Sequence, residues 1–163
     1  MSLLDWCRWL ENTPIVAATG ESVWLFPLIE GTHILTLPLS VGMILMFDLR
    51  LLGIAFSNGA AEKMFGDTLR WARIGFPIMF ITGAMLFATQ ASKAYGNVFF
   101  RAKLILLLIM GLNAALYQVV FYPRMARWDA RGGTPLGARM CGAVSLVGWI
   151  GVIVCGRTMA YQF

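Results

Sequence analysis

The chain has 163 residues, of which 59% are hydrophobic and 13% charged, and its formal net charge is +5. Soluble domains contain about 25% charged residues, so this chain has too few charges for a water-facing surface. The composition therefore excludes a soluble domain and predicts an integral membrane protein. We attribute the positive charge to membrane anchoring and expect no nucleic-acid partner, because no segment resembles a base-reading module.

The N-terminal segment predicts a short amphipathic helix over residues 2–11 that lies in the headgroup plane of a bilayer. Polar side chains recur there at helical spacing, at Ser2, Asp5, Arg8, Glu11 and Asn12. We expect Ser2 to cap this helix, and Thr13-Pro14 to end it and begin another short turn. A positively charged region followed by an apolar core is missing at the start, so we expect no cleavable signal peptide.

Four hydrophobic windows reach the length of about 20 apolar residues that a membrane-spanning helix needs. They are residues 22–47, 74–92, 104–122 and 140–156. Only helices and closed barrels satisfy their backbone hydrogen bonds in lipid, and these continuous runs lack the alternation of barrel strands. The sequence therefore predicts an all-α protein whose single domain, residues 1–163, is a bundle of four transmembrane helices.

The first window carries Glu30 and His33, and His33 is the one histidine of the chain. Ionisable groups cost about 2.5–3.5 kcal/mol each at membrane depth, so they are rare there unless something binds or pairs with them. Glu30, His33, Thr36, Leu37 and Ser40 follow the spacing that places side chains on one helix face. This face should contact protein or a cofactor. Two interpretations stay open: a cofactor ligand, or a Glu30–His33 hydrogen bond that fixes helix packing.

Asp48 and Arg50 end the first hydrophobic segment with opposite charges two residues apart. We expect such residues to set the helix boundary, cap the helix or pair with the third loop, rather than to perform chemistry.

Polar residues of the other windows are expected to gather with His33 in one half of the bundle. Gln90 and Ser92 end the second window, Lys103 lies at the start of the third and Arg157 at the end of the fourth. An up-and-down arrangement brings all of them to the outer half. The alternative for Lys103 and Arg157 is that their long side chains extend to the interface.

The short loops predict the orientation of the chain through their Lys and Arg residues. The first and third loops carry eight of these residues: Arg50, Lys63, Arg70, Arg73, Arg124, Arg127, Arg131 and Arg139. The ends and the second loop carry five: Arg8, Lys93, Arg101, Lys103 and Arg157. This excess places the first and third loops in the cytoplasm and both termini in the periplasm of a bacterial inner membrane.

A single histidine limits the metal chemistry that the chain offers. A haem iron bound by His33 would need Met, Lys, water or another subunit as its second ligand. Met85 and Met110 lie at suitable depths, although Met is also a common core filler. A Cu(I) site of Met and His ligands is the alternative, because soft ligands select this ion. The three cysteines form no paired motif and predict small buried thiols.

Two stretches together resemble a family pattern: His33–Gly42 followed by Asp48–Gly53, and Phe100–Asn113. With Gly83 in the second helix and Gly156-Arg157 in the fourth, they look like a little-characterised family of bacterial four-helix inner-membrane proteins. More distantly, a histidine in the first helix, then a glycine, then a lysine opening the third helix is similar to CopD-type copper proteins. The same pattern is similar to HemJ-type membrane protoporphyrinogen oxidases, which bind b-type haem.

The resemblance implies that His33 is an axial haem ligand and Lys103 an essential basic group, and that Lys103 or Arg157 pairs with a haem propionate or another anion. We therefore expect a haem-b-binding redox protein, or a redox subunit of a larger membrane complex, in which Glu30 orients the imidazole. Its partners would be other membrane subunits or a second copy, with a quinone and a periplasmic redox protein as electron partners. The alternatives are CopD-like copper handling and a cofactor-free structural subunit.

Overall fold

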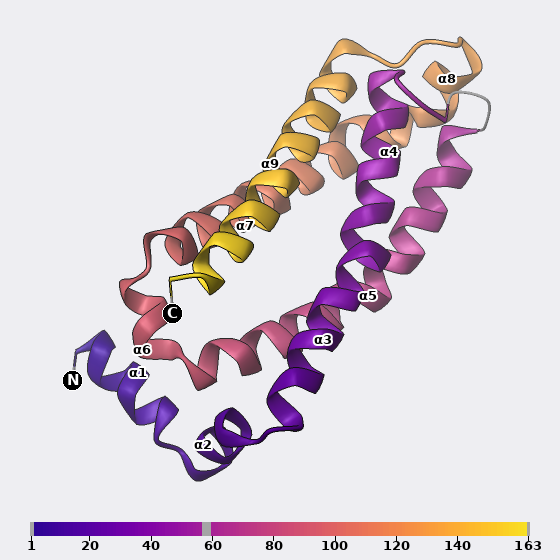
Figure 1. The fold of residues 1–163 in the computed structure, drawn as a ribbon. Coiled ribbons are helices and arrows are strands. Elements are labelled where there is room, and N and C mark those ends of the chain that lie inside the picture. Colours follow the sequence, from indigo (N-terminus) through magenta and orange to yellow (C-terminus); the bar gives the residue numbers. More distant parts are fainter. Residues whose placement is uncertain (1, 57–59, 163) are drawn as a thin grey trace.

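The computed structural model describes residues 2–56 and 60–162. Four helical segments in these ranges are long and apolar enough to cross a membrane. They are Leu25–Leu52, Ala61–Thr89, Val98–Ala130 and Leu136–Ala160. The predicted all-α membrane bundle of four spans is confirmed (Figure 1).

Two short helices precede the first span: α1 (Leu3–Glu11) and α2 (Pro14–Glu21). Ser2 caps α1 as predicted: its hydroxyl accepts a hydrogen bond from the Asp5 amide at 3.1 Å, and the Asp5 carboxylate accepts one from the Ser2 amide at 2.8 Å. Pro14 occupies the first turn of α2, where its missing amide hydrogen costs no hydrogen bond.

The first span has three parts: α3 (Leu25–Leu37), a π-helical turn labelled η1 (Pro38–Gly42) and α4 (Met43–Leu52). The interruption begins at Pro38 because a proline inside a helix removes one backbone donor and clashes with the preceding turn. This span extends five residues beyond the window that hydropathy predicted, and it stops at Gly53, whose φ of 75° favours glycine.

The second span, α5 (Ala61–Thr89), is the longest helix and contains Pro77. It begins 13 residues before the predicted window 74–92, because its first turns are amphipathic: Phe65 and Thr68 are buried while Lys63 and Arg70 are exposed. A hydropathy window detects only the apolar part of such a helix.

The second half of the chain contains α6 (Ala91–Gly96), α7 (Val98–Leu116), a π-helical turn η2 (Tyr117–Phe121), a 3₁₀ turn η3 (Tyr122–Arg124), α8 (Met125–Ala130) and α9 (Leu136–Ala160). Asn97 starts α7 by accepting hydrogen bonds from the amides of Phe99 and Phe100. Both spans here are longer than the predicted windows 104–122 and 140–156, since polar residues continue the helices beyond their apolar centres.

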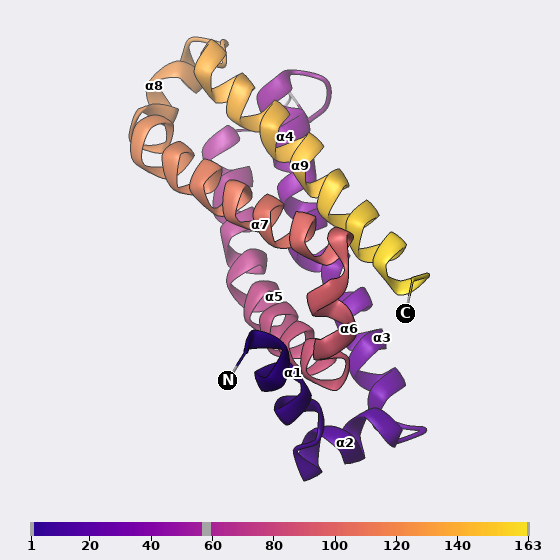
Figure 2. The same cartoon turned by 90° about the vertical axis from the view of Figure 1, so that its left-hand side faces the viewer.

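The bundle has two ends, which differ in how the spans pack. The loop end contains α4, α8 and the first halves of α5 and α9; the termini end contains α1, α6, α3 and the end of α9 (Figures 1 and 2). One cluster of buried side chains joins all four spans at the loop end: Phe47, Leu51, Ala61, Phe65, Tyr117, Met125, Trp128, Ala138 and Cys141. The loop end is therefore closed around a shared core.

Toward the termini end the spans separate into two pairs. There α3 packs on α5 and α7 packs on α9, and the ribbons of the two pairs diverge (Figure 1). The divergence begins near the closest approach of the first two spans, where a Cβ at Gly75 would lie 2.6 Å from Cβ of Ser40. Pro38 and Pro77 lie two residues from this crossing point, and prolines are a common cause of helix bending.

Candidate functional site

His33 lies on α3 in the termini end and faces α5. Its Nδ1 is 2.9 Å from the hydroxyl oxygen of Thr82, which is buried. The Thr82 hydroxyl also lies 2.7 Å from the Ile78 carbonyl; when it donates its proton there, its oxygen accepts from Nδ1–H of His33. The Met79 carbonyl is a second acceptor beside it. In that tautomer of a neutral imidazole, Nδ1 carries the proton and Nε2 carries the lone pair that can bind a ligand.

Gly83 explains why the imidazole fits closely against α5. A Cβ at this position would lie 3.2 Å from Cε1 of His33, which is tighter than ordinary van der Waals contact. A side chain at residue 83 would therefore push the ring away from Thr82. Thr82 contacts the ring through its hydroxyl group, and Gly83 lets the ring lie directly against the backbone of α5.

Lys103 on α7 presents a cation from the opposite helix pair. It is half-buried and lies within electrostatic range of His33. Gly156 on α9 makes room for it, because a Cβ there would be 3.4 Å from the lysine Nζ. Across residues 2–56 and 60–162, no carboxylate forms a salt bridge with Lys103. The site thus joins one imidazole and one cation that has no carboxylate partner among the described residues.

Aromatic side chains bridge the two helix pairs above and below this level. Phe76 of α5 contacts Trp149 of α9 with ring centroids 5.6 Å apart. Phe87 of α5 stacks on Phe100 of α7 at 5.2 Å, with an angle of 8° between the planes. Thr82 lies between Phe76 and Phe87 along α5. The imidazole is therefore flanked along the bundle by two aromatic contacts.

The other predicted site residues lie apart from this pair. Glu30 is exposed, and the Nδ1 partner of His33 is Thr82, so the hydrogen bond expected from Glu30 is made by another residue. Arg157 is also exposed, and its guanidinium carbon lies 4.9 Å from the ring centroid of Tyr161. Both side chains are at the termini end, but neither is part of the His33–Thr82 contact.

The two predicted methionine ligands have different environments. Met85 is 41% exposed, whereas Met110 is 4% exposed and packs with Val41, Trp149 and Val152. A Cβ at Gly148 would collide with the Met110 side chain, so Met110 fills a gap that this glycine leaves. Met110 therefore has the packing role that is common for buried methionines.

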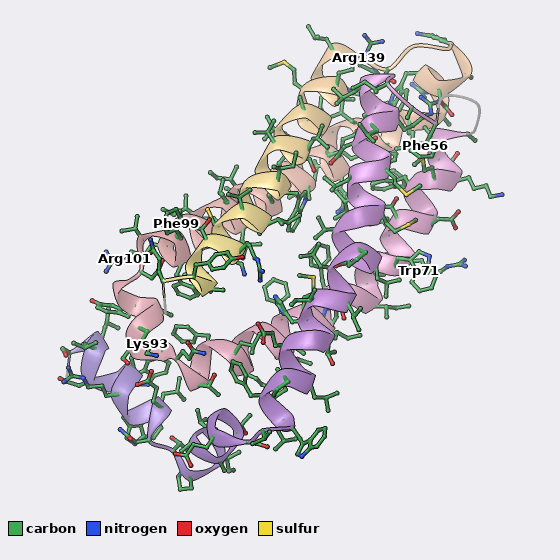
Figure 3. All side chains as sticks on the ribbon, in the orientation of Figure 1. Phe56, Trp71, Lys93, Phe99, Arg101 and Arg139 are labelled. Carbon is green, nitrogen blue, oxygen red and sulfur yellow. The ribbon has the colours of Figure 1, made fainter. Side chains whose placement is uncertain are left out.

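Charged residues gather at both ends of the molecule. Figure 3 shows Lys93 and Arg101 at the termini end and Arg139 at the loop end. The Arg101 guanidinium donates to the Tyr95 carbonyl at 2.9 and 3.1 Å. At the loop end Arg50 pairs with Asp129 of α8 at 2.8 Å. This contact confirms the expectation that the end of the first span pairs with the third loop.

Thr82, whose hydroxyl contacts the imidazole, was not among the site residues predicted from the sequence. A threonine in a transmembrane helix is unremarkable by itself, because its hydroxyl usually bonds to a carbonyl one turn earlier, as Thr82 also does. The available signal was its position next to Gly83, which the family pattern contains. Only the packing of α3 on α5 shows that Thr82 faces His33.

Fold and site together define a multi-pass membrane protein of four helical spans, in which the imidazole of the first span contacts Thr82 of the second span. The chain belongs to the Family of unknown function (DUF6644), whose model matches residues 15–162. The match covers α2 to α9 and hence all four spans. No protein with a curated description and no solved structure matches the chain.

Proposed function

We propose that this protein binds haem b at the termini end, with Nε2 of His33 as an axial ligand, and that it works as a membrane redox protein or a redox subunit. The observation that carries the proposal is the 2.9 Å contact between Nδ1 of His33 and the Thr82 hydroxyl, to which we assign Nδ1 as the donor. Histidines that bind metals almost always donate their other ring N–H to an oxygen acceptor, which fixes the tautomer and the ring orientation. His33 is held in this way by a neighbouring helix.

Lys103 and the aromatic contacts support the same cofactor. A haem carries propionate groups, and a half-buried lysine that forms no salt bridge within residues 2–56 and 60–162 is a suitable counter-ion for one of them. The macrocycle needs apolar surroundings, and the ring pairs Phe76–Trp149 and Phe87–Phe100, on either side of Thr82 along α5, would contribute to them. Because the chain has a single histidine, the second axial ligand would be Met, Lys, water or a group from another subunit.

A bound haem supplies one-electron redox chemistry. The chain's own residues would hold the imidazole plane through Thr82, keep α5 close through Gly83 and balance an anionic charge through Lys103. The pattern of histidine, glycine and lysine that is similar to HemJ-type proteins supports haem, and the similarity to CopD-type proteins makes copper the competing metal.

The proposal includes a place in the cell: the bacterial inner membrane, with the loop end in the cytoplasm and both termini in the periplasm. Four spans bring the chain ends to the same side, and eight of the thirteen Lys and Arg residues lie in the first and third loops or beside them. His33 would then lie in the periplasmic half, where it would exchange electrons between a quinone and a periplasmic partner.

The test is an absorption spectrum of the protein purified in mild detergent from its native membrane. We expect a Soret band, and a b-type α band after reduction with dithionite, both lost in His33→Ala. Glu30→Ala is the matched control, because Glu30 is exposed on the same helix one turn away, and this variant should keep both bands. Thr82→Val should retain haem with about 10–100-fold weaker affinity, the usual effect of losing such a hydrogen bond.

Two results would overturn the proposal. Protein that is free of haem but contains copper, with the copper lost in His33→Ala, would assign the site to copper handling. A featureless spectrum together with no bound metal would leave a structural subunit, in which His33→Leu lowers stability or assembly without any spectral change.

A further inference from the structure

Asp48 is a carboxyl group buried inside the first membrane-spanning segment. It lies on α4 at the loop end, and only 4% of its surface is exposed. Close approach of α9 causes this burial: a Cβ at Gly142 would lie 3.3 Å from the Asp48 carbonyl oxygen and 3.1 Å from Cβ of Leu51. The carboxyl group is therefore enclosed between two helices about 15 residues from His33 along the same span.

No cation balances this carboxyl group in the described part of the chain. Arg50, the nearest basic residue in the sequence, forms its salt bridge with Asp129. Ser145 of α9 is the polar side chain nearest to the carboxyl group, and the Oδ2 atom is buried without a hydrogen-bond partner among the described residues. An ionised carboxylate in this position would be both uncompensated and incompletely hydrogen bonded.

A second buried polar atom without a partner lies on the facing helix. Tyr117, the first residue of η2, is 5% exposed, and no hydrogen bond satisfies its hydroxyl among the described residues. Its ring packs against Phe47 and Phe65, with centroids 5.7 and 5.5 Å away, and Asp48 lies within electrostatic range. Both unsatisfied atoms thus belong to one buried region, at a π-helical turn of the kind that often marks a functional site.

The groups that face Asp48 come from every neighbouring element. Cys141 of α9, Tyr117 of η2 and the Arg50–Asp129 pair of α4 and α8 are the titratable or charged ones. The α5 residues of the surrounding cluster, Ala61 and Phe65, are apolar. Within the described part of the chain, the surroundings therefore offer hydroxyl and thiol groups but no unpaired positive charge.

We propose that Asp48 is a proton-binding site, in which the carboxyl group carries a proton within a buried region that also contains the side-chain hydroxyl groups of Ser145 and Tyr117. Burying an isolated carboxylate is so costly that the group takes up a proton instead, and a neutral carboxyl group has an O–H to donate. One proton is gained, and no electron is transferred. Asp48 lies four residues from the end of α4, about 6 Å along the helix, so a proton would reach it from the loop end.

Infrared spectroscopy of the full chain in lipid, labelled with ¹³C in the aspartate carboxyl groups, tests this proposal. At neutral pH we expect a protonated carboxylic C=O band that shifts with the label and in D₂O. The band should disappear in Asp48→Asn, remain in the exposed control Asp5→Asn and change frequency in Tyr117→Phe. The label separates aspartates from glutamates in the wild type, so this part of the test stands even where Asp48→Asn fails to fold.

Three results would overturn the proposal. One is the lack of a labelled band of this type in the wild type at neutral pH. Another is a band that persists in Asp48→Asn. The third is a band that appears only after sodium and potassium ions are removed, which would assign the site to a monovalent cation. None of these results bears on haem, because His33 and Asp48 lie at opposite ends of the bundle.

Discussion

The loop end closes all four spans around one cluster of aromatic and aliphatic side chains, whereas the termini end holds them as two helix pairs that aromatic rings bridge. The polar residues differ accordingly. Asp48 at the loop end is almost fully buried, while His33 and Lys103 at the termini end are only half-buried. A tightly packed end accommodates a neutral group, and a looser end leaves an imidazole nitrogen and an ammonium group available to a ligand.

The structural origin of this difference lies at mid-span. Pro38 and Pro77 stand close to the crossing of the first two spans, where Ser40 meets Gly75. The Ser40 hydroxyl donates to the Thr36 carbonyl at 3.0 Å, which compensates part of the disturbed backbone hydrogen bonding. Beyond this crossing, toward the termini end, α3 and α5 diverge from α7 and α9 (Figure 1). Because the two ends pack differently, we expect substitutions at the loop end to affect stability and substitutions at the termini end to affect ligand binding.

The largest effect is expected for Asp129→Ala at the loop end. Asp129 accepts hydrogen bonds from Arg50 and from the Ala61 amide, both at 2.8 Å, and so ties α8 to α4 and to the start of α5. Removing one partner of a mostly buried pair costs about 3 kcal/mol or more. Unfolding in detergent measures this loss, and Glu62→Ala, at an exposed site in the first turn of α5, is the control. Equal stability of the two variants would show that this salt bridge does not stabilise the loop end. Loss of a Soret band in Asp129→Ala would show that the loop end also affects ligand binding.

A smaller loss is expected where the two ends meet. In Gly75→Ala the new Cβ would lie 2.6 Å from the Cβ and 3.3 Å from the Cα of Ser40, and the backbone cannot move away cheaply. Overpacking of this kind costs about 1–3 kcal/mol. Gly66→Ala on the same helix is the matched control: nothing lies within 4 Å of its new Cβ, so helix propensity should stabilise the protein by up to about 1 kcal/mol. We expect the free energy of unfolding to fall in Gly75→Ala and to rise in Gly66→Ala. A change of the same sign in both variants would show that the two helices do not pack closely at Gly75.

The aromatic bridge of the termini end should contribute less. A double-mutant cycle of Phe87→Ala and Phe100→Ala is expected to give a coupling free energy of about 0.5–1.5 kcal/mol, the usual range for a pair of packed rings. The same cycle with Phe47→Ala and Phe65→Ala, whose rings lie 5.1 Å apart at the loop end, is the control. Because Phe87 and Phe100 hold the two helix pairs together, their cycle should also change ligand affinity, and the control cycle should not. A coupling free energy of zero would show that these two rings do not hold the helix pairs together.

The smallest effect is expected for α1, which contributes no residue to the buried cluster of the loop end. The backbone amide of Ser2, and then its hydroxyl, hold the pKa of Asp5 below its ordinary value of 3.8. A depressed pKa means that the capping contribution is complete above pH 3.8 and is lost as the pH falls through the lower value of the folded state. An NMR titration of the Asp5 carboxyl carbon should give a midpoint below 3.8, and Ser2→Ala should raise it. A normal midpoint in the wild type would show that the cap does not form in solution.

Several local features of the fold followed from the residues alone. Ser2 and Pro14 predicted the start of α1 and of α2 because caps depend on neighbouring residues. The pairing of Arg50 with the third loop was one of three expected roles, and the salt bridge to Asp129 confirms it. The first third of α5 was missed, because one half of an amphipathic helix is too polar for a hydropathy window.

The site was only partly predictable for a related reason. His33 and Lys103 stand out as ionisable residues in apolar segments, so their cost in lipid singles them out in the sequence. Thr82 and Tyr117 carry no such signal, since their importance depends on which helix faces them. Glu30 also stands out as an ionisable residue in an apolar segment, but its side chain is exposed, because a charge near the end of a span can reach the surface.

The sequence by itself determined that this chain forms four apolar helices, where their caps lie and which ionisable residues enter them, because length, hydropathy and capping are local properties. Only the tertiary structure decided that Thr82 rather than Glu30 holds His33, that Lys103 faces it from the other helix pair, and that Asp48 is enclosed without a cation. These relations depend on helix rotation and on close approach at glycines, which emerge when side chains from distant segments pack together.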